Sequence, residues 1–208
     1  MVEASGVAEQ QQTLASEWGG GQSPFAVGWP KLMMWLFLVS DTLTFAGLLT
    51  GYGVMRLSLG RWPVQFQIFN IWLVSLMTFI LICSSATMAV AVAAARRADH
   101  SRVLRFLLLT ALGGLFFLGA QAYEWTHFIH EGARLFGNPW GIPQFSATFF
   151  IITGFHGGHV TGGVIYLLIT YLRWARGSIQ PESVEIAGLY WHFVDLVWVF
   201  IFTLLYLL

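Results

Sequence analysis

Charged side chains are scarce in this chain of 208 residues. Asp, Glu, Lys and Arg together make up 10% of it, whereas hydrophobic residues make up 57%. A soluble domain carries about 25% charged residues, so most of the surface of this protein does not face water. The ten basic residues balance ten acidic ones, which leaves no basic footprint for nucleic acid. We therefore predict a membrane protein with no nucleic-acid partner.

Cysteine is nearly absent as well. The single cysteine, Cys83, excludes an internal disulfide and a thiolate metal cluster. It lies inside an apolar run, and a free cysteine in such a place behaves as a small hydrophobic residue. We expect its side chain to be buried.

Proline is missing from the interior of every long apolar run, as unbroken helices require. Five runs are long enough to cross a bilayer, for which about 20 apolar residues suffice. They cover residues 31–55, 66–95, 103–129, 145–172 and 185–208. The sequence predicts an all-α integral membrane protein, a bundle of five transmembrane helices within residues 29–208. Residues 1–28 are polar and lack the features of a signal peptide, so we expect a flexible N-terminal tail.

The distribution of Lys and Arg predicts the orientation of the bundle, because cytoplasmic loops carry an excess of both. One side has seven of these residues and the other has three. We therefore expect a cytoplasmic N-terminus and a C-terminus outside. The strongest anchor is the loop with Arg96, Arg97, Arg102 and Arg105, which is predicted mainly as a topology signal and also as a contact for anionic lipid.

Ionisable side chains inside the apolar runs are costly and are rarely kept without a reason. Helical rise places Asp41 and Asp195 at a similar depth, near the middle of the membrane, with His156 and His159 on the fourth run. We predict a buried polar layer in which at least one aspartate pairs with a histidine of the fourth run. His192, three residues before Asp195, belongs to the same layer and competes for that aspartate. Protonated, neutral aspartates are the alternative.

Two further patterns suggest sites of other kinds. Glu124 and His127 share a helix face near a span end, and we expect an outer polar face or lipid contact rather than a metal box, because nothing completes a metal site. Gly154, Gly158 and Gly162 recur every four residues and form a predicted helix-packing groove, within this chain or against a partner. We predict no catalytic group and no metal site on this chain.

Three segments resemble subunit III of the haem-copper terminal oxidases, also called cytochrome c oxidase subunit III. They are Thr153-Gly-Phe-His-Gly-Gly-His159, Tyr190-Trp-His-Phe-Val-Asp-Leu-Val-Trp198 and Gln121-Ala-Tyr-Glu-Trp125. They stand in the family's order over a match from about Lys31 to the C-terminus. Five predicted helices, rather than the family's usual seven, are similar to its short bacterial form.

This resemblance implies a function that the residues alone do not. The chain would be a non-catalytic, accessory multi-pass subunit in the bacterial cell (inner) membrane, within a respiratory complex that reduces oxygen and translocates protons. It would bind no cofactor itself, because haem and copper belong to the partner subunits I and II. Its implied roles are to support proton uptake, to hold structural phospholipids and to stabilise the complex, which can join a larger respiratory supercomplex.

Several alternatives stay open. The family usually has Glu at the position of Asp41, and short quinol oxidase members are similar to the Asp version, so the electron donor is either cytochrome c or quinol. An accessory subunit of nitric oxide reductase is a more distant possibility. A stand-alone b-type membrane cytochrome using His156, His159 and His192 belongs to a different class, as does a small transporter with a proton relay in the membrane.

Overall fold

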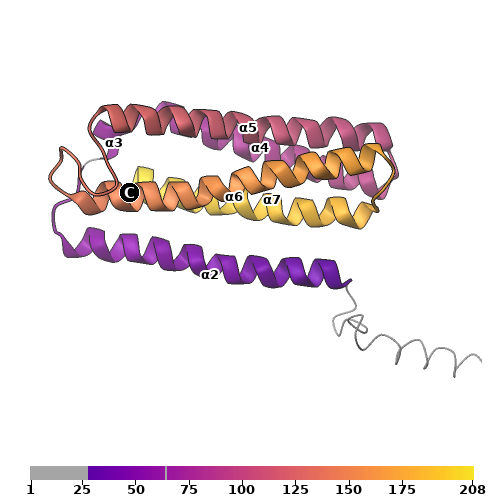
Figure 1. The fold of residues 1–208 in the computed structure, drawn as a ribbon, viewed down its shortest axis with the longest axis horizontal. Helices are drawn as coiled ribbons and strands as arrows, with labels where there is room; N and C mark the ends of the chain where they lie inside the picture. The colour runs from indigo at the N-terminus through magenta and orange to yellow at the C-terminus, as the bar shows by residue number, and fades with distance from the viewer. Residues whose placement is uncertain (1–27, 64) are drawn as a thin grey trace, which may run out of the picture. The chain divides into compact units, whose positions relative to one another are not determined.

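The computed structural model describes residues 28–63 and 65–208, and these are almost entirely helical (Figure 1). The predicted N-terminal tail lies outside this described part, apart from its last residue. No β-strand occurs in the described ranges. The elements are α2 (Trp29–Ser58), α3 (Gln65–Ile68), α4 (Ile71–Arg96), α5 (His100–His130), α6 (Pro143–Ala175), α7 (Pro181–Ile201) and the π-helix η1 (Phe202–Leu207).

Four helical stretches are long and apolar enough to cross a membrane. They are α2, α4, α5 and the continuous stretch Pro181–Leu207. The remaining long helix, α6, has 33 residues and no charged side chain within residues 145–172. It is not among the four, and Gly, Thr and His interrupt its apolar run. The all-helical class and the multi-pass membrane character predicted from composition are confirmed.

The start of the second predicted span was wrong. Instead of one helix from Phe66, the chain forms the short α3, leaves helical geometry at Phe69 and Asn70, and begins α4 at Ile71. The Asn70 side chain accepts a hydrogen bond from the backbone N–H of Leu73 at 3.3 Å. This cap satisfies one of the free N–H groups at a helix start, a signal that apolar periodicity does not contain.

The chain divides between Ser40 and Asp41 into two units, and the packing described below lies within residues 41–208. Here α4 packs against α5 and α7, and α6 also packs against α5 and α7. Four helices therefore form a closed ring, in which each contacts two neighbours. Cys83 is exposed on α4, contrary to the expectation of burial, because Leu81, Ser84 and Met88 take the inward positions of this helix.

Indole groups join the helices of the ring by hydrogen bonds to hydroxyl side chains. Each bond gives a hydrogen-bond partner to one polar atom on each side chain, in a region of the bilayer that contains no water. Two join α7 to α4 and one joins α5 to α6. The donors and acceptors are Trp191 and Ser84 at 3.1 Å, Trp198 and Thr78 at 2.9 Å, and Trp125 and Thr153 at 3.1 Å.

An aromatic cluster fills the end of the ring near the α5–α6 connection. The ring of Phe69 lies 5.0 Å from that of Phe149 and 4.9 Å from that of Tyr206. Phe128 of α5 lies 4.7 Å from Phe149 of α6. Such pairs add to the stabilisation from apolar burial, and this cluster ties Phe69, before α4, to three other elements.

Gly114 marks the closest approach inside the ring. A Cβ atom at this position would lie 2.7 Å from Cγ2 of Val164 and would also clash with the ring of Trp191. Both neighbours are buried, and a fused ring cannot move aside by a rotamer change at its tip. Helices α5, α6 and α7 meet here because residue 114 has no side chain.

We predict that Gly114→Ala destabilises the bundle, because overpacking a tight core typically costs about 1–3 kcal/mol. The midpoint of thermal unfolding in mild detergent, followed by circular dichroism, should fall. The matched control is Gly119→Ala in the same helix, where an added Cβ meets nothing within 4 Å. It should leave the midpoint unchanged or raise it, since Ala is the better helix former. Equal midpoints for both variants would contradict the tight contact.

Candidate functional site

The first polar pair joins Asp41 of α2 to His159 of α6. Oδ2 of Asp41 lies 3.2 Å from Nε2 of His159, and both side chains are largely shielded. Nδ1 of His159 lies 2.9 Å from the carbonyl oxygen of Phe155. A carbonyl only accepts, so Nδ1 carries a proton in this contact. Nε2 and Oδ2 are within ion-pair distance, but the two atoms do not meet the geometry of a hydrogen bond.

Two neighbours fix this pair in place. The hydroxyl of Tyr190 on α7 donates to the carbonyl oxygen of His159 at 3.0 Å. The ring of Phe45, one turn after Asp41, lies 5.4 Å from the imidazole ring. The pair thus joins α2, α6 and α7 at one point.

His156, one turn before His159, has a different environment. Its side chain is completely buried, stacked 5.1 Å from the ring of Trp198 and edge-on to Phe117 at 5.6 Å. Neither ring nitrogen has a hydrogen-bond partner among the residues that the structure describes. His156 packs as an aromatic side chain, away from the carboxylates.

A second polar group lies between α4 and α7. The hydroxyl of Ser85 is 2.6 Å from Nδ1 of His192, and it also reaches the carboxyl of Asp195. Asp195 is 8% exposed, and its Oδ1 has no partner within the described residues. The carboxyl of Asp195 therefore contacts a serine of α4 rather than a histidine of α6.

The third group centres on Glu124, which is only 6% exposed. Its Oε2 accepts hydrogen bonds from Nε2 of Gln121 at 3.0 Å and from the hydroxyl of Tyr206 at 2.8 Å. Its Oε1 has no partner in the described part of the chain. The wide π-helical turn of η1 carries Tyr206 to this carboxyl, 82 residues away in sequence.

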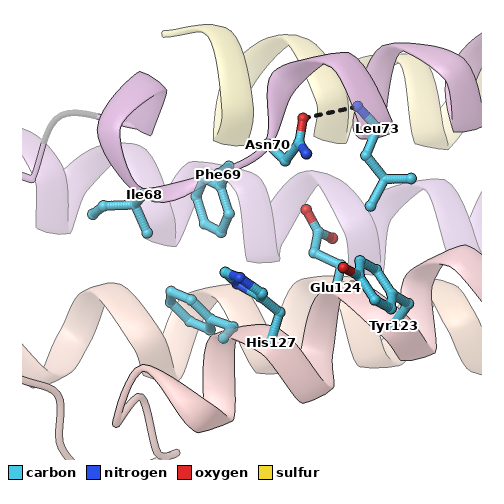
Figure 2. Close-up of a pocket in the computed structure, with 8 residues that line it drawn as sticks. Ile68, Phe69, Asn70, Leu73, Tyr123, Glu124 and His127 are labelled. Atoms are coloured by element: carbon cyan, nitrogen blue, oxygen red, sulfur yellow. Dashed lines mark hydrogen bonds between the residues drawn. The ribbon is translucent and has the colours of Figure 1, made fainter.

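Glu124 and His127, predicted on one polar face, have separate environments. His127 is 60% exposed on its side chain and lies 3.5 Å from Glu131. Both residues line a cavity of about 100 Å³ between α5 and the segment around Asn70. Figure 2 shows the Glu124 carboxyl pointing toward this segment, with Tyr123 and His127 along the same helix.

The remaining predicted residues lie at helix contacts and in the α4–α5 turn. Gly154 is close to the ring of Trp125 and Gly162 to the hydroxyl of Tyr190, whereas Gly158 meets nothing. Within this chain the three glycines therefore do not form one packing seam, and a seam against a partner stays a prediction. The arginines of the turn are exposed: Arg96 pairs with Glu185 at 3.2 Å, Arg102 pairs with Asp99 at 3.5 Å, and Arg97 and Arg105 lie beside them.

An apolar groove runs between α2 and α7. It has a volume of about 240 Å³ and an almost purely apolar lining. The α2 side of the groove is made by Thr42, Phe45, Ala46 and Leu49, and the α7 side by Phe193, Leu196, Val197 and Phe200.

The buried polar layer predicted from depth is thus divided into local groups. Asp41 joins His159, and Asp195 and His192 join Ser85, while His156 stands apart. Sequence reasoning missed Ser85 and Tyr206, whose only signal is a hydroxyl inside an apolar run. No group of three or more His, Cys, Asp or Glu side chains placed to hold a metal ion occurs in residues 28–63 and 65–208.

Comparison with known proteins gives consistent results. A family model described as cytochrome c oxidase subunit III matches residues 16–208. The chain is 34% identical over 180 residues to quinol oxidase subunit 3 of Bacillus spizizenii, which covers 85% of this chain and 86% of that protein.

Relatives named cytochrome c oxidase subunit 3 are similar to this chain to the same degree. The probable cytochrome c oxidase subunit 3 of Nocardia farcinica is 35% identical over 175 residues, or 82% of this chain and 84% of that protein. Cytochrome c oxidase subunit 3 of Bacillus sp. (strain PS3) is 32% identical over 180 residues, or 85% and 84%.

We predict that Tyr206→Phe destabilises the bundle, because a buried carboxyl oxygen loses one of its two donors. The loss of one hydrogen bond costs about 0.5–1.5 kcal/mol, which should lower the midpoint of thermal unfolding. Tyr123→Phe is the matched control, since Tyr123 lies on α5 beside Glu124 and is 61% exposed. That variant should unfold like the parent protein. Indistinguishable midpoints for the two variants would show that the Tyr206 hydroxyl contributes nothing.

Proposed function

This chain belongs to the cytochrome c oxidase subunit III family, and we propose that it acts as a non-catalytic subunit bound to subunits I and II of its oxidase. As a member of that family it is an accessory subunit of a haem-copper terminal oxidase. The observation that carries the non-catalytic role is the separation of its three membrane histidines. His156 is enclosed by aromatic rings, His159 contacts Asp41, and His192 contacts Ser85. The redox centres are then those of the partner subunits.

We predict that purification in mild detergent recovers this chain together with a larger chain that contains haem. After the two are separated, the isolated chain should show no Soret band in its optical spectrum. A stoichiometric haem on the isolated chain would instead support the stand-alone b-type cytochrome. Recovery as a fully functional monomer would argue against any oxidase subunit role.

The electron donor of the complex is a separate question, because relatives named for quinol and for cytochrome c are similarly identical to this chain. The cytochrome c form is the one we propose, on the basis of the aromatic segment Tyr190–Trp198, and the quinol oxidase is the alternative. Oxygen uptake by the purified complex with reduced cytochrome c, compared with uptake with a quinol, decides between them.

We propose that the chain lies in the bacterial cell (inner) membrane, with its N-terminus in the cytoplasm and residues 29–208 as the membrane domain. The exposed arginines of the α4–α5 turn support this orientation, because cytoplasmic loops are rich in basic residues. The same side chains would contact anionic lipid head groups, each at a gain of about 1 kcal/mol near the surface. Glu124 and His127, at the other end, would then lie toward the outer face.

Asp41 and His159 are the residues proposed to support proton supply to the partner. Their side chains lie 3.2 Å apart, and the pair lies near the middle of the α2 span. Any effect on oxygen reduction would be indirect, through proton uptake and the durability of the complex. Membership in a larger respiratory supercomplex is part of the same proposal.

The apolar groove between α2 and α7 is proposed to hold an acyl chain of a structural phospholipid. Its lining has almost no polar surface, and it lies within helices that cross the bilayer. A groove of this kind accepts a lipid tail in place of an adjoining side chain.

We predict that Ala46→Trp, which fills the groove, lowers the number of phospholipids that remain bound per complex after purification. The control is Leu43→Trp on the same helix, which is 70% exposed in the parent chain and lies outside the groove lining. Phosphate analysis or native mass spectrometry gives the count. Equal lipid counts for both variants would reject the groove as a binding site.

A further inference from the structure

The polar group of Ser85, His192 and Asp195 lies at the surface of the ring, in the middle of the membrane. Ser85 is eleven residues before Arg96 at the end of α4, which corresponds to about 16 Å along the helix. Ser85 and His192 are partly exposed, while Asp195 is buried behind them. Half-exposed ionisable groups at this depth are costly in contact with lipid tails.

The hydrogen bonds of the group leave one atom available on its outer side. Nδ1 of His192 faces Ser85 at 2.6 Å, while no partner for Nε2 lies within the described residues. When the serine hydroxyl donates to Asp195, it accepts from Nδ1–H, and Nε2 is then an acceptor. A group that docks here needs an N–H or O–H donor aimed at Nε2.

The helix surface beside His192 permits a close approach. Ser85, Ala89 and Ala93 follow one another at steps of four residues on α4, and both alanines are exposed. Small residues at this spacing let a second helix come near, so that hydrogen bonds form between the helices. At the end of α4, an ion pair between Arg96 and Glu185 joins this helix to α7.

We propose that this α4–α7 seam, formed by Ser85, Ala89 and Ala93 of α4 and Leu189 and His192 of α7, is the docking surface for a transmembrane helix of the haem-bearing partner subunit. That helix presents a hydrogen-bond donor to His192 near the bilayer centre. The inference rests on the proposed function, since it names the face that a subunit of this oxidase would use. The outward faces of α5 and α6 carry apolar side chains such as Leu112 and Ile165, which suit lipid.

Photocrosslinking in the native membrane tests the choice of face. A photoreactive phenylalanine analogue replaces Leu189 at the seam or Ile82, which is exposed on α4 three residues before Ser85. In separate variants it replaces Leu112 or Ile165 on the opposite side, always in the otherwise intact complex. We expect the seam positions to crosslink to the haem-bearing chain and the opposite positions to crosslink only to lipid. Crosslinks to that chain from Leu112 or Ile165 alone would overturn the seam but keep the proposed function. No crosslink from any position, together with no haem in the purified material, would reject both.

A substitution series tests the role of Nε2. In His192→Phe complexes, retention of the partner over a detergent titration should fall by about three- to twentyfold, the range for one hydrogen bond between membrane helices. His192→Gln, which can still accept a hydrogen bond, should restore part of this loss. The control, His127→Phe, changes an exposed histidine outside the seam and should leave retention unchanged. Equal retention in all three variants, with each chain folded by circular dichroism, would overturn the role of His192.

Discussion

A polar group inside a bilayer has to find its hydrogen-bond partner within the protein, because the hydrocarbon supplies none. In this chain most threonine and serine hydroxyls bond to a carbonyl of their own helix, whereas the indole groups bond between helices. Indole N–H groups of α7 and α5 donate to hydroxyls of α4 and α6, and Tyr206 donates to Glu124. Each bond requires a fixed register between two helices, so the polar atoms, though few, decide how the apolar surfaces are aligned.

The same constraint explains why the buried ionisable side chains lie in three separate polar groups rather than in one network. Asp41 contacts the nearest imidazole, that of His159, and Asp195 contacts the nearest hydroxyl, that of Ser85. Glu124 is held by Gln121 on its own helix and by Tyr206. A long network would need polar atoms along a continuous path, whereas His156 is surrounded by the aromatic rings of Phe117 and Trp198.

The sequence was sufficient for the helical class, for the approximate spans and for the family. Hydrophobic length fixes the spans, and three short segments carry the family resemblance. The break before Ile71 was not predictable from apolar length, because it depends on the Asn70 cap. The partner of Asp195 was also missed, since depth along a helix gives the height of a residue and not the direction in which it points. Ser85 lies at the right height and on the facing side of α4, and only the packed structure shows the second fact.

Helix α6 shows how polar side chains that are covered inside the subunit differ from those left open to a partner. Gly, Thr and His interrupt its apolar run, yet it packs against α5 and α7 and contributes both His156 and His159. Its glycines bring it close to Trp191 and Trp125, so much of its polar surface is covered inside the chain. The polar group on α4 and α7 is covered to a lesser degree, because Ser85 and His192 stay partly exposed. A helix surface whose polar atoms are hydrogen-bonded within the subunit can face lipid. A surface that leaves polar atoms exposed in the membrane favours contact with another protein.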